Sequence, residues 1–355
     1  MAKNIILLAN ILFAVFHLFG VISTIISPLW TTFFAYFGLF SPFIILLNIC
    51  FIILWIIRKR KLWIISASIL ILTYPYVNSV FTVPYRKLTN QTFDKEIKVL
   101  SYNISLLSGV KKIDDFVKFI DSVDADIMCF QEFGFFRKDK DKLKNALQKK
   151  YPYSHIWYKN QTKNYWWGVA TFSKYPIVNK KKVDYNSLYN VSIYSDITIN
   201  ADTVRVINNH LESNKFTLSD IKQYRSLNQD FSSENIVNIS SLLSRKLSKA
   251  YKIRASQAAI VRKVIDDSPY RLVVCGDFND VAESYAYHKI KSDLVDLSTA
   301  TSWGYRYSFH NNYMLVGIDH ILIDKSFVPI SLHIDRITFS DHYPLIGSFG
   351  ISRSK

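Results

Sequence analysis

The sequence predicts a layered α/β domain that follows three membrane-spanning helices. Residues 1–80 contain no Asp or Glu and only five basic residues, and three long apolar runs fall there. After residue 96, short strand-like runs alternate with turns and helical segments. Such alternation indicates sheets packed face to face with helices outside. A chain of 355 residues can hold one large domain or two modest ones.

The three apolar runs cover roughly residues 5–26, 32–57 and 62–80. Each is close to the ~20 residues that cross a bilayer as a helix. A cleaved signal peptide would give one short run with a small-residue cleavage site, so three successive runs favour a retained anchor. A buried hydrophobic helical domain is the alternative. The third run is interrupted near its end by Tyr74, Pro75 and Tyr76.

Basic residues predict the orientation of this anchor. The cluster Arg58-Lys59-Arg60-Lys61 lies between the second and third runs and is expected in the cytoplasm. The chain after about residue 81 would then be extracytoplasmic, in a multi-pass membrane protein. If the third run does not span, the α/β domain would be cytoplasmic instead. We therefore expect an anchor over residues 1–80, a polar connector over 81–96 and the α/β domain over 97–355.

Charge and cysteine content narrow the class of protein only a little. The chain has 44 basic and 28 acidic residues, and removing the five basic residues of the anchor leaves 39 against 28, or +11. A basic domain suits an anionic ligand such as nucleic acid, phospholipid or sugar phosphate, although an ordinary solvated surface would look the same. Cys50, Cys129 and Cys275 lie in apolar runs, as small core residues do, rather than in a disulfide or metal-site pattern.

The elements of the α/β domain are predicted from hydrophobic spacing. Strands are expected at residues 96–102, 126–130, 168–173, 192–199, 203–208, 271–275, 317–323 and 344–351, and helices at 111–122, 140–150 and 257–266. The polar segment 213–250, with a helical patch near 236–247, interrupts this rhythm. It could be a lid, but we favour a surface insertion, because loops grow at little cost in free energy.

Polar residues that follow buried strands indicate the chemistry. Asp277 and Asn279 follow the strand at 271–275; two residues apart on an extended backbone, they would face the same way. Asp341 and His342 stand side by side near another apolar stretch. Acids, an amide and a histidine at strand ends can hold a divalent metal against a phosphate and activate water. The sequence therefore predicts a metal-dependent phosphoesterase.

Several motifs in a fixed order carry a family resemblance. They are Ser101-Tyr102-Asn103, Gln131-Glu132, the run 168–177, Asn209-His210-Leu211-Glu212-Ser213, Gly276-Asp277-Phe278-Asn279, Ile318-Asp319-His320 and Ser340-Asp341-His342. Together they resemble the endonuclease/exonuclease/phosphatase superfamily, which has the DNase I-like fold, over about residues 97–350. The resemblance implies a four-layer α/β sandwich of two packed mixed sheets flanked by helices.

The metal ligands are expected to be Asn103, Glu132 and Asp341. Glu132 can reach the strand tip without burying its charge, and an amide at Asn103 can touch the metal or orient the water. The resemblance implies that Asp341 is also a ligand. Mg²⁺ prefers few carboxylates and keeps several waters, so we expect Mg²⁺, with Mn²⁺ as a substitute. Ser105 replaces a second acidic position of the family, which favours one metal ion.

The resemblance also implies the catalytic roles. Asp277 orients or deprotonates the attacking water, Asn279 donates to phosphate oxygens, and His210 polarises the phosphate. His342 contacts the scissile phosphate while Asp319 orients it and favours its charged form. The sequence departs from the family at Gly317 and His320; we favour a structural role for His320 and a positional one for Glu212.

The expected function is Mg²⁺-dependent hydrolysis of phosphodiester or phosphomonoester bonds by in-line attack of water, most plausibly by a nuclease-like phosphodiesterase. The alternatives are a sphingomyelinase-like phospholipid phosphodiesterase at the membrane surface and a catalytically silent binding or sensor protein. Aromatic clusters at 165–167 and 303–307 could stack on bases, lie at a lipid interface or fill the core. The expected partners are a phosphate-ester substrate and the membrane, with no protein partner.

Overall fold

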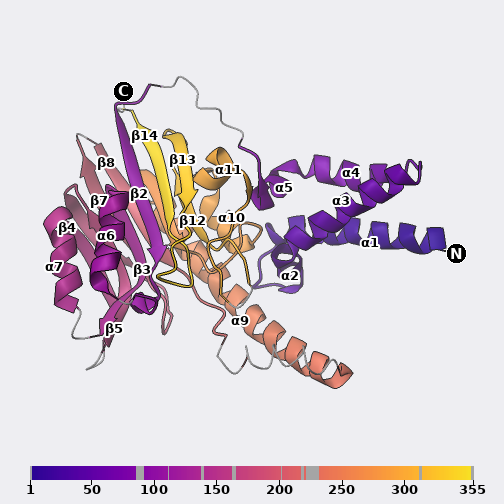
Figure 1. The fold of residues 1–355 in the computed structure, drawn as a ribbon, viewed down its shortest axis with the longest axis horizontal. Coiled ribbons are helices and arrows are strands. Elements are labelled where there is room, and N and C mark those ends of the chain that lie inside the picture. The colour runs from indigo at the N-terminus through magenta and orange to yellow at the C-terminus, as the bar shows by residue number, and fades with distance from the viewer. Residues whose placement is uncertain are drawn as a thin grey trace.

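Two six-stranded mixed sheets form the centre of the α/β domain (Figure 1). The computed structural model describes residues 2–84, 92–110, 112–136, 140–161, 165–200, 202–216, 220, 232–311 and 314–352. One sheet has the order β10 (Val295–Asp296), β12 (Asp319–Ile323), β9 (Arg271–Asp277), β8 (Asp202–His210), β7 (Ser192–Ile199) and β6 (Ile177–Val183). The other has the order β13 (Val328–Ile334), β14 (Leu345–Ile351), β2 (Lys95–Asn103), β3 (Ile127–Phe136), β5 (Tyr165–Ser173) and β4 (Tyr153–Gln161).

Alternation along the strands builds the core between the sheets. In β2, Val99 faces the opposite sheet, where it belongs to one cluster with Val206 and Val273. Its neighbour Leu100 points outward and packs with Phe116 of helix α6 (Ile113–Val123). Successive side chains of a strand point to opposite faces of the sheet, so both are apolar here because both faces are covered.

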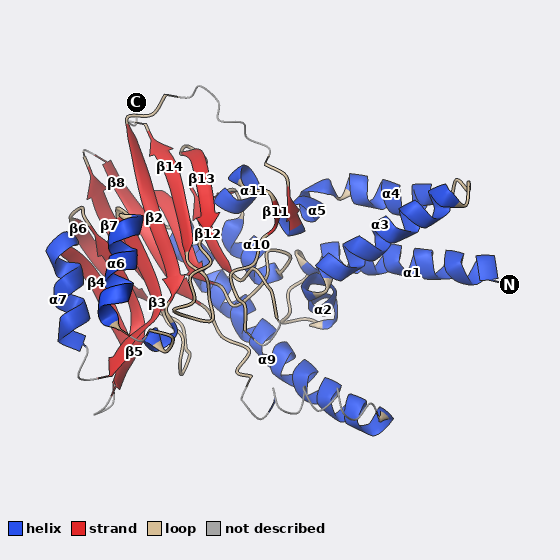
Figure 2. Cartoon of the chain, in the orientation of Figure 1, coloured by secondary structure: helices blue, strands red, loops and turns tan. Residues whose placement is uncertain are grey.

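Helices cover both outer faces, which gives four layers (Figure 2). Helix α6 and α7 (Lys140–Lys150) pack on the sheet that contains β2. Helix α9 (Ser233–Asp266) and α10 (Tyr285–Lys291) pack on the sheet that contains β9. The α/β fold with two flanked mixed sheets is confirmed.

Among the described strands longer than two residues, hydrophobic spacing missed three, namely β4, β6 and β13. They lie at or near sheet edges, and β6 carries Lys180, Lys181 and Lys182 on a half-exposed strand. The predicted helix at 257–266 and the helical patch near 236–247 are parts of the single 34-residue helix α9. Residues 217–219 and 221–231 of the expected insertion lie outside the described residues.

The N-terminal unit is helical but bent. Its helices are α1 (Ala2–Ser23), α2 (Phe33–Leu39), α3 (Ser41–Ile57), α4 (Trp63–Leu72) and α5 (Tyr74–Val80). Only α1 is by itself long and apolar enough to cross a membrane; α2 with α3 and α4 with α5 pass that test only as pairs bent by 69° and 83°. Three continuous spans are thus not confirmed. Pro42 and Pro75 each lie in the first turn of a new helix, where proline is tolerated.

Four short elements remain. The 3₁₀ turn η1 (Ser105–Leu107) and helix α11 (Leu297–Thr301) belong to the α/β domain, and strands β1 (Phe81–Thr82) and β11 (Gly304–Tyr305) join the helical unit to it. The expected connector begins with β1, which pairs with β11 as a separate two-stranded sheet. Residues 85–91 of the connector lie outside the described residues.

Candidate active site

Sheet register brings the predicted site residues to one end of the sandwich. Each sheet contains one parallel pair, β2 with β3 and β8 with β9, and the carboxyl ends of these strands carry Asn103, His210 and Asp277. His210 pairs with Asp277 across β8 and β9, and Asp277 pairs with Asp319 across β9 and β12. Gly276, with φ +125°, keeps β9 close to β8, since a Cβ there would collide with the backbone of Asn209.

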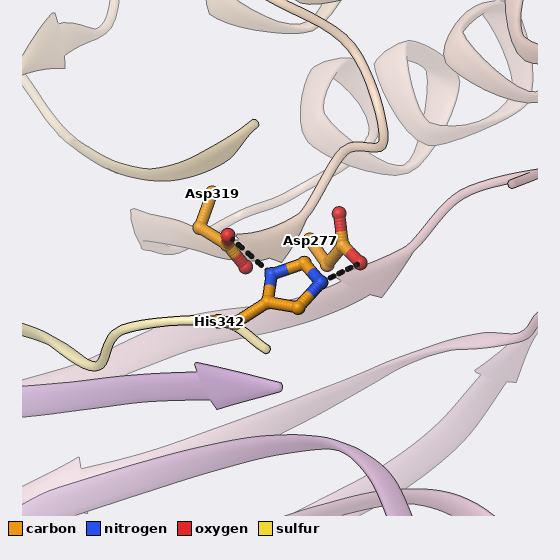
Figure 3. A group of neighbouring side chains, drawn as sticks. All are labelled: Asp277, Asp319 and His342. Carbon is orange, nitrogen blue, oxygen red and sulfur yellow. Dashed lines mark hydrogen bonds and ion pairs between the residues drawn. The ribbon is translucent and has the colours of Figure 1, made fainter. Parts of the chain in front are cut away.

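Asp319 and His342 form a buried ion pair (Figure 3). The Asp319 Oδ2 atom lies 2.8 Å from His342 Nδ1, and His342 Nε2 points toward Asp277 Oδ2 at 3.9 Å. Burial disfavours the charged ring, but Asp319 and then Asp277 overcome this and raise the pKa of His342 to about 10. His342 is therefore an imidazolium at neutral pH.

Asp277 is held from several sides. Its Oδ2 accepts from Asn103 Nδ2 at 2.9 Å, and its Oδ1 accepts from the Asn279 backbone at 2.7 Å. Burial, reinforced by the charge of Asp319, raises the pKa of Asp277 to about 6. A carboxylate with this pKa is ionised at neutral pH yet basic enough to accept a proton.

Glu132 reaches the site from a β-bulge. The register of β3 against β5 shifts between Phe130 and Phe133, and Glu132 has φ +47°. Its side chain is 30 % exposed, and its Oε1 atom lies 3.3 Å from Asn103 Nδ2 and 3.8 Å from His210 Nε2. Burial and neighbouring acids raise the pKa of Glu132, whereas burial lowers the pKa of His210. His210 is therefore a neutral ring, with one N–H and one acceptor nitrogen.

Asn279 joins the site in a different conformation from the one expected. It has φ +52°, so the chain turns after Asp277 rather than continuing extended. Its Nδ2 donates to the Leu211 carbonyl at 3.0 Å and lies 3.2 Å from Asp277 Oδ2. The side chains of Asp277 and Asn279 still meet, because the turn at Asn279 brings the amide back to the carboxylate.

Asp341 lies at the edge of this group. Its Oδ2 accepts from Asn311 Nδ2 at 3.1 Å, and it lines an open groove of about 310 Å³ together with Ser108 and His310. Its charge contributes to the raised pKa values of both Glu132 and His342. The other seven predicted residues are connected to one another by the contacts described above.

Two sets of side chains could hold a metal. Asp277, Asp319 and His342 bring one ligand atom each within 4.8 Å of one another, but an imidazole suits Zn²⁺ or iron better than Mg²⁺, and its Nδ1 already binds Asp319. Asn103, Glu132 and Asp341 offer only oxygen ligands, and both acids are partly exposed. This second set fits Mg²⁺.

Sequence reasoning missed two supports of the site. The buried Ser308 hydroxyl accepts from the Asp319 backbone at 3.1 Å, and the buried Arg254 of α9 binds Asp280 at 3.0 Å and the Glu212 carbonyl at 2.8 Å. Neither residue belongs to a motif, so the sequence contained no local signal for them. His320 is buried, packs against the Tyr287 ring at a tilted angle and contacts the Asp280 carbonyl, as a structural residue would.

Comparison with known families decides the assignment. A family model described as the endonuclease/exonuclease/phosphatase family matches residues 100–342, more than half of the chain. The chain belongs to the endonuclease/exonuclease/phosphatase family. Members of this family are hydrolases of phosphate esters, so the predictions of the family and of an enzyme of this class are confirmed. A second model, a domain of unknown function (DUF8431), matches residues 3–80. No curated protein matches the chain.

Solved structures share the fold of this family member. An endonuclease/exonuclease/phosphatase from Bacteroides vulgatus aligns with a TM-score of 0.52 at 17% identity, covering 73% of this chain and 100% of that one. The structure of SmcL aligns with a TM-score of 0.50 at 16% identity, again covering 73% of this chain and 100% of that one. At these identities the likeness extends to the fold alone.

Proposed function

We propose that this protein is a Mg²⁺-dependent phosphodiesterase of the nuclease type, anchored in a membrane. The observation that carries the proposal is the buried Asp319–His342 ion pair beside Asp277, with the side chains of Asn103 and Glu132 next to it. These groups supply a cation, a base and metal ligands around one point, as in-line hydrolysis requires.

Each side chain has a role in the proposed reaction. Asp277 accepts a proton from the attacking water, since its pKa of about 6 leaves it ionised at neutral pH. His342, held charged by Asp319, donates from Nε2 to a phosphate oxygen and stabilises the developing negative charge. The neutral His210 donates to a remaining phosphate oxygen, and Asn279 Nδ2 donates to another in exchange for its contact with Asp277 Oδ2. Bound Mg²⁺, held by Asn103, Glu132 and Asp341, would neutralise phosphate charge and assist the leaving oxygen.

The groove beside Asp341 favours nucleic acid as the substrate. His310 lines the groove and stacks on Tyr343 at 3.9 Å between ring centroids. The Arg336 guanidinium lies over Tyr343 at 4.8 Å and over Tyr307 at 4.0 Å. A stack of rings with a guanidinium beside a scissile phosphate is the kind of surface on which bases of a single strand stack.

A phospholipid is the second candidate substrate, and a different observation favours it. Trp303 is 67 % exposed, and Met314 and Leu315 are also exposed in the segment that begins beside β11. Because β11 pairs with β1 at the end of the helical unit, these apolar side chains lie near the proposed membrane surface. Exposed tryptophan is favoured at such an interface.

We also propose that residues 1–80 cross the membrane three times and that 81–96 connect them to a catalytic domain at 97–355. Figure 1 shows α1, α3 and α4 side by side, with the basic turn at 58–61 at the end far from the α/β domain. Asn10 donates to Ser66 and Ser66 to Asn48, as polar groups do between packed membrane helices. The basic turn would then lie in the cytoplasm and the catalytic domain outside it.

The proposal is tested on the full chain in detergent micelles with Mg²⁺. Substrates are single-stranded DNA, supercoiled plasmid and sphingomyelin vesicles, and Asp277→Asn is compared with Asp324→Asn, a charge removal at the far end of β12. DNA cleavage that only Asp277→Asn abolishes is the expected result. Cleavage of sphingomyelin alone would select the lipid candidate. A folded protein that binds Mg²⁺ but cleaves nothing would support the silent binding or sensor alternative.

A further inference from the structure

The N-terminal helical unit touches two loops of the α/β domain, and both carry catalytic acids. One loop follows Asp277 at the end of β9, and the other precedes Asp319 at the start of β12. The contacts are polar and buried or partly buried, and they come from helices α1 and α5 and from strand β1.

Glu283 is the contact point on the first loop. The Ser23 hydroxyl of α1 donates to the Glu283 carbonyl at 2.8 Å, and the Ser79 hydroxyl of α5 donates to its carboxylate at 2.7 Å. Helix α2 packs closely here as well. A Cβ at Gly38 would lie 2.6 Å from Ser23 Oγ and 2.9 Å from the Glu283 carbonyl oxygen, so only glycine fits without a shift. Glu283 itself is buried.

Strand β1 is the contact on the second loop. It pairs with β11, and the buried Thr82 hydroxyl donates to the Gly304 carbonyl at 2.9 Å. From β11 the chain folds back on itself, with Phe309 bridged to Val316. The segment 304–317 is therefore held at its start by the helical unit and at its end by Asp319.

Ser308 connects this segment to both members of the catalytic ion pair. Its hydroxyl accepts from the backbone N–H groups of Ile318 at 3.2 Å and Asp319 at 3.1 Å. Its carbonyl accepts from the Tyr343 N–H at 2.6 Å, and the next residue, Phe309, is bridged to His342 and packs edge-on against its ring. One residue of the hairpin thus fixes the backbone on both sides of the Asp319–His342 hydrogen bond.

The two parts of the chain meet with little space between them. They enclose a cavity of about 50 Å³, whose lining includes Leu39 and Val80 from the helical unit and Glu283, Asp319 and His320 from the α/β domain. A few waters fit in such a volume. The helical unit therefore packs closely against the Asp319 strand.

We propose that the N-terminal helical unit positions the catalytic acids through Glu283 and the 304–317 segment, so that it sets the rate of hydrolysis as well as the location of the enzyme. Catalytic groups must be held within about 0.5 Å of their productive geometry. A misplacement of about 1 Å by a change outside the chemistry can lower the rate by about a hundredfold. Ser79, Gly38 and Ser308 are positioning residues in this scheme. The inference rests on the proposed function for its rate measurement only.

The test uses the full chain in detergent micelles with two variants at this contact. Gly38→Ala inserts a methyl group between α2 and Glu283, and Ser79→Ala removes the hydrogen bond to its carboxylate. Ser79→Thr keeps that hydroxyl, and Ser240→Ala removes an exposed hydroxyl of α9 that bonds only within its helix. Hydrogen exchange of residues 278–285 and 304–320 is measured by mass spectrometry, with kcat and KM for single-stranded DNA.

We expect faster exchange in both segments for Gly38→Ala and Ser79→Ala, a kcat lower by roughly ten- to a hundredfold and an unchanged KM. Ser79→Thr and Ser240→Ala should match the wild type. Unchanged exchange and kcat in the two test variants would overturn the proposal, as would faster exchange spread evenly over the whole α/β domain. If the wild type cleaves no phosphate ester, the proposed function fails, while the exchange data still decide this inference.

Discussion

Replacing Asp319 with Asn should lower the pKa of His342 while a side chain of the same shape still holds the ring in place. The folded protein holds the pKa of His342 at about 10 against an ordinary value of 6.5, and the ring is buried. That difference corresponds to about 5 kcal/mol of net attraction to the carboxylates around it. Asp319 is the larger contributor and Asp277 the smaller, so Asp319 supplies at least half, on the order of 2–3 kcal/mol.

The expected consequence is a pH-dependent loss of activity in Asp319→Asn. Without this partner the pKa of His342 falls toward its ordinary range, so about nine in ten of the variant's rings are neutral at pH 9, where the wild-type ring is still charged. Because only about a tenth of the variant then carries the charge, we expect kcat to fall about tenfold at pH 9. At pH 6 the ring is protonated in both proteins, so the loss should be smaller there. Asp324→Asn is the matched control.

The same shift has a defined sign for stability. Because the folded pKa of His342 exceeds the unfolded value, the ion pair stabilises the fold fully below about pH 6.5, and this contribution is lost as pH rises through about 10. The midpoint temperature of thermal unfolding should therefore fall more between pH 7 and pH 9.5 for the wild type than for Asp319→Asn. A wild-type to variant ratio of kcat that stays constant from pH 6 to pH 9 would refute the reasoning.

Three further predictions concern the other groups of the site. Asp277→Asn should lower kcat by about 10²- to 10⁴-fold, and the wild-type rate should fall as pH drops through about 6, because protonated Asp277 cannot accept a proton; an acid limb unchanged from wild type in a residually active variant would contradict this. Glu132→Gln should weaken Mg²⁺ binding at least about tenfold in calorimetry, since Mg²⁺ prefers carboxylate oxygens; equal affinities would remove Glu132 from the metal site. Arg254→Met should cost about 3–5 kcal/mol of unfolding free energy, because it leaves Asp280 buried without its partner; Arg262→Met, which removes a half-exposed pair with Asp266, is the control and should change little.

Part of the candidate site could be predicted because its signals are local. Asp277 ends a buried strand, so an apolar run followed by a polar residue already marked the tip of the sheet, whereas His210 was predicted only through the family resemblance of its motif. The prediction of an extended backbone from Asp277 to Asn279 was wrong, because the left-handed conformation at Asn279 leaves no pattern in a single sequence.

The supports of the site were not predictable in this way. Ser308 reaches Asp319 and Tyr343 only because the segment 304–317 folds back on itself, and Arg254 binds Glu212 across 42 positions of the chain. Such contacts depend on tertiary packing rather than on local spacing. The bends before α3 and α5 did have a signal in Pro42 and Pro75: the interruption at Pro75 was noted in the sequence, whereas the apolar residues around Pro42 concealed the first bend.

The backbone at Glu132 is left-handed, so the acid proposed as a metal ligand has a conformation that lowers the stability of the fold. Among the described residues, ten other than glycine have positive φ, and five of these, Ser105, Leu106, Leu107, Glu132 and Asn279, lie in or beside the site. Each such residue costs about 1–3 kcal/mol. A Glu132→Gly protein should therefore be inactive yet more resistant to heat than the wild type. Selection for activity keeps an acid where selection for thermal resistance would choose glycine.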